Sequence, residues 1–433
     1  MALEQFRTKT VQPGELAVVV GAGRSGKAAA RLLLQDGAKV RLLEKDPANI
    51  DAEFLREMTQ AGAEVITGEH GPQHFADAAY VIPSPGMPVA TLLPMLPASG
   101  GPEVMAEMEL AWRHLHGEPV LAVTGTSGKT TTVSLAAAML QAQGLSVFLG
   151  GNIGTPLSEY ILSGRKADVL VVEISSFQLQ TCSTFCPRVG VILNISPNHL
   201  DYHKDMEEYI DAKFRLLRCQ SADDMAVLGE DVRELAEVRN VPSLKIWIDP
   251  AMNRFPESQL FGKHNRVNME AAWLACRPFG VTEAAAAKAV AGFKPLPNRL
   301  ERVDEKNGVL YVNDSKSTTI AALEVALAAF DRPVRLLCGG KFKGGDLSVL
   351  NDLVRAHVVA VALFGACREH FEQAWRGIVP MTWDATLEEA VRRVHTQAKA
   401  GDVVLMSPAT ASFDLYKNYV ARGNDFKRVV GLL

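Results

Sequence analysis

Short apolar runs alternate with helix-like stretches along almost the whole chain. Runs rich in Val, Leu and Ile, bounded by Gly, Pro or polar clusters, predict buried strands. The predicted strands are residues 16–20, 40–43, 80–82, 119–122, 167–173, 188–194, 309–312, 334–338, 358–364 and 402–406. The predicted helices are residues 107–112, 132–140, 209–215, 261–273 and 283–291. Strands that alternate with helices predict parallel sheets with helices on both faces, which is the α/β class.

Two breaks in this pattern divide the chain into three blocks. The first is a Pro/Gly-rich stretch at residues 83–102, and the second lies near Pro297. At about 150 residues per domain, 433 residues also suggest three domains. The predicted boundaries are 1–103, 104–298 and 299–433.

Composition narrows the class of protein. With 45 basic and 49 acidic residues the net charge is −4, which argues against a nucleic-acid-binding protein. Residues 1–9 contain no signal-peptide core, and no apolar stretch is long enough to span a bilayer. The six cysteines are scattered, and Cys182 and Cys186 have no second ligand pair nearby, so zinc is not predicted. These features favour a reduced, cytoplasmic protein with buried thiols.

The central block carries a phosphate-binding loop. Residues 125–131 read Gly-Thr-Ser-Gly-Lys-Thr-Thr, between a predicted strand and a predicted helix. Glycines let backbone N–H groups face phosphate oxygens, and the helix N-terminus adds partial positive charge. Lys129 is expected to reach the terminal phosphates, and Thr130 to contact Mg²⁺. Val123 stands where the strict eight-residue pattern has Gly, so the match is to a shortened variant.

A second glycine-rich turn, Gly-Ala-Gly-Arg-Ser-Gly at residues 21–26, follows the first predicted strand. Glu44 closes the next strand about twenty residues on, the spacing of an NAD-binding motif with the acid on a ribose hydroxyl. A glycine-rich turn at a helix N-terminus holds the pyrophosphate of a nucleotide sugar equally well. A turn needed only for helix–sheet packing is the third interpretation. Ser84, Pro85 and Gly86 follow another strand and are expected beside this turn.

Polar side chains follow two central strands. Glu173 ends one, and Asn-His-Leu-Asp at residues 198–201 follows another. Residues after the carboxyl ends of neighbouring parallel strands converge, so Glu173, His199 and the phosphate loop are expected to meet. Glu173 is a candidate Mg²⁺ ligand, and His199 a Mg²⁺ ligand or substrate contact. His199 and His203, with Asp201 between them, lack a third zinc ligand, and we expect His203 at the surface.

The third block places three loops after predicted strands, at residues 313–318, 338–346 and 407–414. Lysines, hydroxyls and helix starts of this kind can bind anionic groups. Asp314 and Lys316 lie in the first of these loops, and Arg299 lies at the second boundary.

Four of these segments together resemble the Mur ligases of peptidoglycan synthesis, and the resemblance covers essentially the whole chain. They are residues 125–131, Gly-Asn-Ile-Gly at 151–154, Glu-Ile-Ser-Ser-Phe-Gln-Leu at 173–179, and Asn-His-Leu-Asp at 198–201. The Ser-Ser-Phe-Gln-Leu run is similar to the branch that joins D-glutamate to UDP-N-acetylmuramoyl-L-alanine. Related branches, including folylpolyglutamate synthases, carry other residues there. Ser127 departs from the family, which usually has Asn.

The resemblance implies a fold and an activity. It implies a Rossmann-like N-terminal domain for the UDP substrate, a central P-loop ATPase-like domain, and a doubly wound Rossmann-like C-terminal domain for the amino acid. The activity is that of a cytoplasmic, monomeric, ATP-dependent acid–amino-acid ligase acting through an acyl phosphate. It implies ATP, two Mg²⁺ ions and a CO₂-derived carbamate on Lys213, with no nucleic-acid partner and no membrane insertion. Without the resemblance, Lys213 would be an ordinary lysine on a helix surface.

The resemblance also assigns the site residues, by position in this sequence. The catalytic set is Lys129, Glu173, His199, Lys213 and Lys316, and the metal set is Thr130, Glu173, His199 and Lys213. The ATP set is Gly125, Thr126, Ser127, Gly128, Lys129, Thr130, Thr131, Asn265, Asn268, Arg299 and Asp314. The UDP-substrate set is Gly23, Arg24, Ser25, Glu44, Lys45, Ser84, Pro85, Gly86, Asn152, Ser175 and Gln178. The D-glutamate set is Thr318, Lys343, Ser412 and Tyr419, where Tyr419 replaces a Phe often found in that site.

Three alternatives remain at this point. Another Mur-type or folylpolyglutamate-type amide ligase would share most of the motifs. An NAD-dependent dehydrogenase rests on the first glycine-rich turn alone and leaves Lys129 and Glu173 unexplained. A P-loop binding or switch protein explains the central block but not the third.

Overall fold

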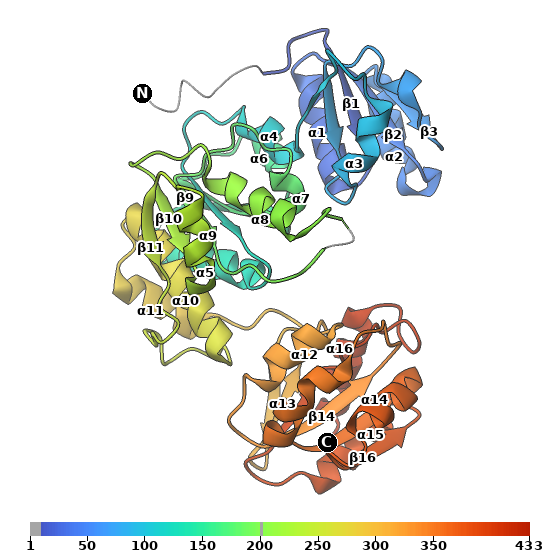
Figure 1. Cartoon of the computed structure of the whole chain (residues 1–433), viewed down its shortest axis with the longest axis vertical. Helices are drawn as coiled ribbons and strands as arrows, with labels where there is room; N and C mark the ends of the chain where they lie inside the picture. Colours follow the sequence, from blue (N-terminus) through green and yellow to red (C-terminus); the bar gives the residue numbers. More distant parts are fainter. Residues whose placement is uncertain (1–9, 200–201) are drawn as a thin grey trace. The chain divides into compact units, whose positions relative to one another are not determined.

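The computed structural model describes residues 10–199 and 202–433, and in these ranges it contains three α/β sheets (Figure 1). Leu200 and Asp201, the last two residues of the Asn-His-Leu-Asp motif, lie outside the described residues, as do residues 1–9. The α/β class with mostly parallel sheets, predicted from the alternation of strands and helices, is confirmed.

The first sheet has the order β3-β2-β1-β4-β5 and is parallel throughout. Its strands are β1 (Leu16–Val20), β2 (Lys39–Glu44), β3 (Glu64–Thr67), β4 (Tyr80–Pro83) and β5 (Glu103–Val104). Helices α1 (Arg24–Gln35), α2 (Ala52–Gln60) and α3 (Val89–Leu92) belong to it. Along β1, Ala17 and Val19 enter one apolar core and Val18 and Val20 another, so both faces of the sheet are covered.

The second sheet has the order β11-β10-β9-β6-β8-β7 and is also parallel. Its strands are β6 (Val120–Thr124), β7 (Val147–Gly151), β8 (Val169–Glu173), β9 (Val189–Ile192), β10 (Met225–Leu228) and β11 (Leu244–Trp247). Its helices are α4 (Glu107–Trp112), α5 (Lys129–Ala142), α6 (Leu157–Leu162), α7 (Ser176–Leu179), α8 (Met206–Phe214) and α9 (Arg233–Val238). Two further helices follow, α10 (Lys263–Cys276) and α11 (Glu283–Gly292). The central strands β6 and β8 are buried along their full length, as expected of parallel strands covered on both faces.

The third sheet has the order β12-β13-β17-β14-β15-β16. Its strands are β12 (Glu301–Lys306), β13 (Val309–Asn313), β14 (Val334–Gly339), β15 (Val358–Phe364), β16 (Met381–Asp384) and β17 (Val403–Met406). Only β12, at the edge, runs antiparallel within this sheet. The helices, orange to red in Figure 1, are α12 (Ile320–Leu327), α13 (Asn351–His357), α14 (Arg368–Trp375), α15 (Leu387–Gln397) and α16 (Tyr419–Gly431). Val312 and Tyr311 enter different apolar cores, so helices cover both faces here too.

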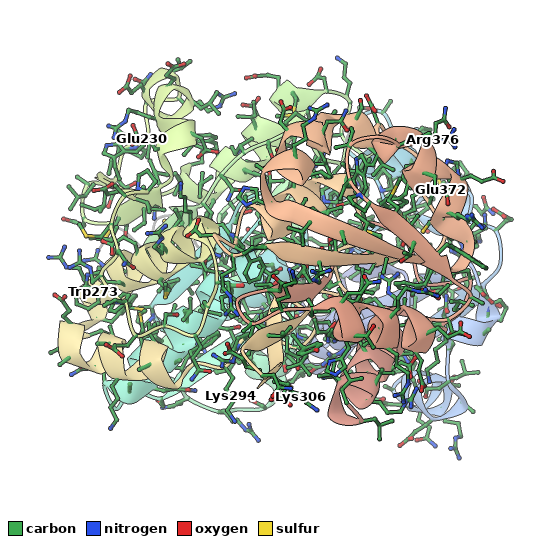
Figure 2. All side chains as sticks on the ribbon, turned by 90° about the horizontal axis from the view of Figure 1, so that it is seen from below. Glu230, Trp273, Lys294, Lys306, Glu372 and Arg376 are labelled. Carbon is green, nitrogen blue, oxygen red and sulfur yellow. The ribbon has the colours of Figure 1, made fainter. Side chains whose placement is uncertain are left out.

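The described chain divides into two compact units. One holds the first two sheets and the segment Asn268–Ala289. The other holds the segments Asn253–Val267 and Val290–Leu433, and with them the third sheet. The three domain boundaries stay predictions. Exposed charged side chains such as Glu230 and Arg376, labelled in Figure 2, project away from the ribbon. No helix within the described ranges has the length and apolar character needed to cross a membrane.

Candidate active site

The phosphate loop connects β6 to α5. Gly128 caps α5 in the left-handed conformation with φ of 86°, and Gly125 has φ of 149°. A side chain at Gly128 would collide with Oδ1 of Asn268, and one at Gly125 would place its Cβ 3.1 Å from that of Leu193. Both positions therefore require glycine, and the N-terminus of α5 that follows them is the end of the helix that attracts anions.

Lys129 lies inside this loop. Its Nζ donates hydrogen bonds to the carbonyl oxygens of Gly125 and Thr126, each at 2.9 Å. The loop thus holds an ammonium charge at the N-terminus of α5, where the helix dipole also attracts anions. Lys129 and the loop glycines are placed as the sequence predicts.

A second layer of polar groups fixes the loop. Asn194, just after β9, accepts from the Ser127 N–H at 2.8 Å and donates to the Ser127 carbonyl at 3.2 Å. The hydroxyl of Thr126 lies 3.0 Å from that of Tyr209 on α8. Sequence reasoning gave no role to Asn194 or Tyr209. The one feature of the sequence that could have pointed to Asn194 is its place as the last residue of the predicted strand 188–194.

Lys213 is buried beside the loop, with 1% of its surface exposed. Its Nζ donates to the Gly125 carbonyl at 2.8 Å and lies 4.5 Å from the centre of the Tyr209 ring. Burial, and then the charge of Lys129, lower the pKa of Lys213 to about 6. The surface position expected from its helix pattern alone is wrong, because the face of α8 that carries Tyr209 and Lys213 packs on the phosphate loop.

Glu173 ends β8 beside the start of the loop, in register with Val123 of β6. Its Oε1 accepts from the Asn152 side-chain amide at 2.8 Å. Its Oε2 is buried, and no hydrogen-bond partner for it lies among residues 10–199 and 202–433. A buried carboxylate oxygen without a donor is costly unless a cation binds it. Together with Thr130 in the first turn of α5, this arrangement fits a Mg²⁺ ion bound to nucleotide phosphates.

The two histidines after β9 differ in environment. His199 is exposed, has φ of 55°, and its ring lies edge-on to Phe177 at 4.8 Å. His203 is 1% exposed, and its Nε2 lies 2.9 Å from the Ser176 hydroxyl. The expected surface position of His203 is therefore wrong, because its ring stacks on Phe177 and closes an aromatic cluster. Burial lowers the pKa of His203, which favours the neutral ring.

The Ser-Ser-Phe-Gln segment forms the first turn of α7. Ser175 and Gln178 cap this turn reciprocally, with the Gln178 amide oxygen accepting from the Ser175 N–H at 3.1 Å. Phe177 stacks on Tyr202 at 3.8 Å, and the Tyr202 hydroxyl donates to the Met87 carbonyl at 2.9 Å. A small cavity is lined by residues of this cluster and of the loop after β4, including Ser84, Pro85 and Gln178. These three predicted UDP-substrate residues therefore lie together.

The first glycine-rich turn connects β1 to α1. Glu44 accepts from the Ala22 N–H at 2.7 Å through Oε2, and from the Asp46 N–H and the Asn49 side chain at 3.0 Å through Oε1. These bonds fix the Glu44 carboxylate against the turn, and Oε2, with one donor, can still accept a further hydrogen bond, so they favour neither a dinucleotide nor a nucleotide sugar. The N-terminus of α1 has no side-chain cap, which leaves its backbone donors for a phosphate group.

The remaining predicted UDP-substrate residues lie around this turn. Ser25 is half-buried, Gly86 is exposed, and Gly21 packs against Ser84. Arg24 and Lys45 are exposed, with acidic neighbours Glu159 at 3.9 Å and Glu69 at 3.0 Å.

In the second compact unit, a buried arginine on α16 ties three loops together. Arg422 is fully buried and donates to the carbonyl oxygens of Ser315 at 2.9 Å, Gly339 at 2.8 Å and Thr410 at 3.1 Å. Ser315 and Thr410 lie in the loops after β13 and β17, and Gly339 is the last residue of β14. Burial lowers the pKa of Arg422 to about 10, so the guanidinium keeps its charge at neutral pH. Sequence reasoning missed Arg422, because an arginine in an amphipathic helix normally faces solvent.

The predicted D-glutamate residues lie on these loops and on α16. Ser412 is buried, Thr318 and Tyr419 are half-buried, and Lys343 is exposed. A Lys341–Ala411 backbone pair joins the second and third loops, and an Ala409–Ser317 hydrogen bond joins the third and first. The loops therefore lie side by side at the carboxyl ends of strands β13, β14 and β17.

Of the predicted ATP-site residues of this unit, Arg299, Asp314 and the neighbouring Lys316 lie at the turn before β12. Asp314 accepts from the Leu300 N–H at 3.1 Å and the Ser407 hydroxyl at 2.8 Å, and burial raises its pKa to about 7. Arg299 is exposed on this turn, and Lys316 lies 5.6 Å from the Tyr419 ring. Asn265 donates to the Phe261 carbonyl at 2.7 Å. Asn268, in contrast, belongs to the first unit, beside Gly128.

Comparison with known proteins places these features in a family. Residues 123–248 match the Mur ligase middle domain, and residues 298–410 match the glutamate ligase domain of Mur ligases. The chain is 65% identical over 430 residues to the UDP-N-acetylmuramoylalanine–D-glutamate ligase of Nitratidesulfovibrio vulgaris, covering 99% of both chains. It is 64% identical over 438 residues to the enzyme of the same name from Desulfovibrio desulfuricans, covering 100% of both.

Solved structures show the same fold. The MurF ligase of Thermotoga maritima, solved in complex with ADP, superposes with a TM-score of 0.60 at 19% identity, over 91% of this chain and 94% of that one. The chain belongs to the Mur ligase family, in the branch of the UDP-N-acetylmuramoylalanine–D-glutamate ligases.

Proposed function

We propose that this protein uses ATP to join D-glutamate to UDP-N-acetylmuramoyl-L-alanine, in peptidoglycan precursor synthesis. The observation that carries the proposal is the glycine-rich loop with Lys129, in a chain that is 65% identical over its length to ligases of that name. The dehydrogenase alternative leaves the loop position of Lys129 and the buried carboxylate of Glu173 unexplained.

The chemistry runs in two steps. A carboxylate oxygen of the UDP substrate attacks the terminal phosphorus of ATP, which gives an acyl phosphate and ADP. The amine of D-glutamate then attacks the acyl carbon, phosphate leaves, and an amide forms with loss of a proton. Lys129 and Lys316 are proposed to neutralise charge on the transferring phosphoryl group. Holding the reactants on separate domains requires closure when they bind, with hinges proposed near Glu103 and Pro297.

Thr130, Glu173 and His199 are proposed to hold Mg²⁺ with the nucleotide. A bound Mg²⁺ ion shields the negative charge of the phosphates and orients them. The buried, unpartnered Oε2 of Glu173 supports this assignment. His199 supports it less directly, since its exposed position after β9 suits a contact with either metal or substrate.

Lys213 is proposed to carry the CO₂-derived carbamate. A neutral amine adds to CO₂ and releases a proton, which yields an anionic group. The pKa of about 6 leaves Lys213 mostly neutral at pH 7, so the reaction is open to it. An anion at this position is also favourable beside the ammonium of Lys129 and near a divalent cation.

Substrate sites are proposed on the first and third sheets. The turn at residues 21–26, with Ser84, Pro85 and Gln178, is proposed for the UDP substrate. The three loops held by Arg422 are proposed for D-glutamate, with Lys343 and Ser412 facing its carboxylates. We further propose a cytoplasmic monomer.

The test is phosphate release from ATP by the purified full chain. Release is expected only when UDP-N-acetylmuramoyl-L-alanine and D-glutamate are both present, and no nicotinamide cofactor is needed. Lys129→Ala is expected to lose about 10²- to 10³-fold in turnover, the range for one preorganised donor to a developing charge. Lys166→Ala, which removes an exposed lysine, is the matched control. Near-normal turnover by the Lys129 variant, or micromolar binding of NADH without binding of the UDP substrate, would refute the proposal.

A further inference from the structure

A cavity of about 310 Å³ lies against α8 and the short 3-10 helix that follows it, η4 (Arg215–Leu217). Its apolar floor consists of Phe214, Leu217 and Val241, which are 7%, 1% and 6% exposed. Around them lie three arginines, Arg215, Arg218 and Arg239. An apolar cavity of this size with a few polar groups at its rim is typical of a small-molecule site.

The three arginines differ in how they are paired. Arg239 is neutralised by Asp211 at 2.8 Å and by Glu207. Arg218 donates a hydrogen bond to the Ser183 carbonyl at 3.0 Å. A carbonyl is uncharged, so this bond does not neutralise the guanidinium. Asp211 is the one acidic side chain that lines the cavity in the described part of the chain, and Arg239 already binds it.

Among the residues that the structure describes, Arg215 has no direct partner, and the carboxylates of Asp211 and Glu208 act on it only from beyond ion-pair distance. Across residues 10–199 and 202–433, its half-buried guanidinium makes no hydrogen bond and no ion pair. A guanidinium that is partly removed from water without an anion is unfavourable, and a bound carboxylate would relieve that cost through paired N–H···O bonds.

We propose that this cavity binds a small molecule that bears a carboxylate on an apolar body. The carboxylate pairs with Arg215 and Arg218, and the apolar part covers Phe214, Leu217 and Val241. Inorganic phosphate lacks the apolar part and gains nothing from the small exposed area of this floor, so we expect the cavity to prefer a carboxylate on an apolar body.

The cavity is distinct from the nucleotide site. Tyr209 and Lys213 lie one helical turn apart and face the phosphate loop. Asp211 and Arg215 each lie two residues from Lys213, about 200° around a helix of 3.6 residues per turn, and line the cavity. An occupant would therefore contact the helix that carries Lys213 from its opposite face.

The experiment is a calorimetric titration of the full chain with 2-naphthoate. Saturable binding is expected, and Arg215→Gln is expected to weaken it by about tenfold or more, since a charge-assisted pair is lost. Val241→Phe fills the cavity without changing its charge and is expected to weaken binding as well. Arg165→Gln, which removes an exposed arginine outside the cavity, is expected to bind like the wild type. A thermal unfolding curve for each variant confirms that it is folded.

Three outcomes would overturn the proposal. The first is no saturable binding of 2-naphthoate by the wild type. The second is equal affinity of the folded Arg215 and Arg165 variants, which would place the ligand elsewhere. The third is a loss of selectivity, seen either as equal binding of the neutral 2-naphthylmethanol or as displacement of naphthoate by equimolar phosphate, because each of these contradicts one half of the proposed recognition.

Discussion

Lys213 is a single residue whose chemistry its surroundings change. In water its amine would be protonated at pH 7, yet burial and Lys129 lower its pKa to about 6. Its Nζ is held by a hydrogen bond to the Gly125 carbonyl of the phosphate loop. An amine so placed is both unprotonated and fixed, which are the two conditions for a lysine to react as a nucleophile.

Replacement of Lys213 tests this directly. Lys213→Ala is expected to lose about 10- to 100-fold in turnover, the range for groups that orient a metal site. Added acetate should restore part of the activity by supplying an anion at the vacated position. Lys213→Arg should not respond to acetate, because a guanidinium keeps the positive charge. Steady-state phosphate release measures all three; an alanine variant with normal turnover in carboxylate-free buffer would show that Lys213 has no such role.

At the scale of single residues, the sequence predicted which side chains belong to the phosphate loop better than it predicted which side chains are buried. The loop glycines, Lys129 and Glu173 were identified because their chemistry requires a strand–turn–helix context that the pattern reveals. The burial of His203 and Lys213 depends on Phe177 and on the phosphate loop, which are distant in the chain. No local period carries that information, so both were expected at the surface from pattern alone.

At the scale of elements, most central strands could be predicted, because parallel strands buried on both faces read as continuous apolar runs. Residues 16–20 and 358–364 match β1 and β15 residue for residue. The edge strand β12 was missed, since its sequence Glu-Arg-Val-Asp-Glu-Lys is mostly polar and one side is open to solvent. Strand β16 was missed for the same reason, as Trp383 remains 39% exposed.

The turn between β1 and α1 offers a matched pair of glycines. A Cβ at Gly26 would collide with the Gly21 carbonyl oxygen, whereas at Gly23, with φ of −68°, it would meet nothing within 4 Å. Gly26→Ala is expected to destabilise the protein by about 1–3 kcal/mol through overpacking. Gly23→Ala is expected to change stability by less than about 0.5 kcal/mol. Thermal unfolding of the two variants compares them, and equal midpoints would show that the close helix–strand approach is absent in solution.

At the scale of the first compact unit, His114 joins α4 to the end of α1. Its Nε2 lies 2.8 Å from Asp36, and its Nδ1 lies 2.8 Å from the Leu110 carbonyl. Both partners only accept hydrogen bonds, so the doubly protonated ring satisfies them best. Burial lowers the pKa of His114, but the Asp36 carboxylate and the Leu110 carbonyl outweigh it and the net pKa is raised above 6.5.

A raised folded-state pKa stabilises the protein in the protonated form. The contribution is complete below pH 6.5, the ordinary value, and is lost as the pH rises through the raised pKa. Wild-type protein is therefore expected to lose more thermal stability between pH 6 and pH 8 than His114→Phe does. His116→Phe, two residues on at an exposed position, serves as the control. Identical pH profiles for the wild type and the His114 variant would contradict the assignment.

The division into two compact units determines which fragments of the chain can fold by themselves. The chain passes between the units three times, after Met252, Val267 and Ala289. Phe261, from the short segment Asn253–Val267, lies 5.2 Å ring to ring from Phe330 and packs on the core beneath the third sheet. A fragment that begins at residue 299 therefore lacks Phe261, which packs on its core.

Fragment expression tests this. Residues 299–433 alone are expected to melt at a lower temperature than residues 253–267 joined by a short Gly/Ser linker to 290–433. Phe261→Ala in the linked fragment should remove much of the difference, by about 2 kcal/mol or more for a lost aromatic contact. Equal melting temperatures would show that the segment is dispensable. If the expected order is found, residues 299–433 are not a self-contained folding unit. One recombination event could not transfer them intact to another gene, because the segment Asn253–Val267 that completes their core is encoded before residues 268–289 of the other unit.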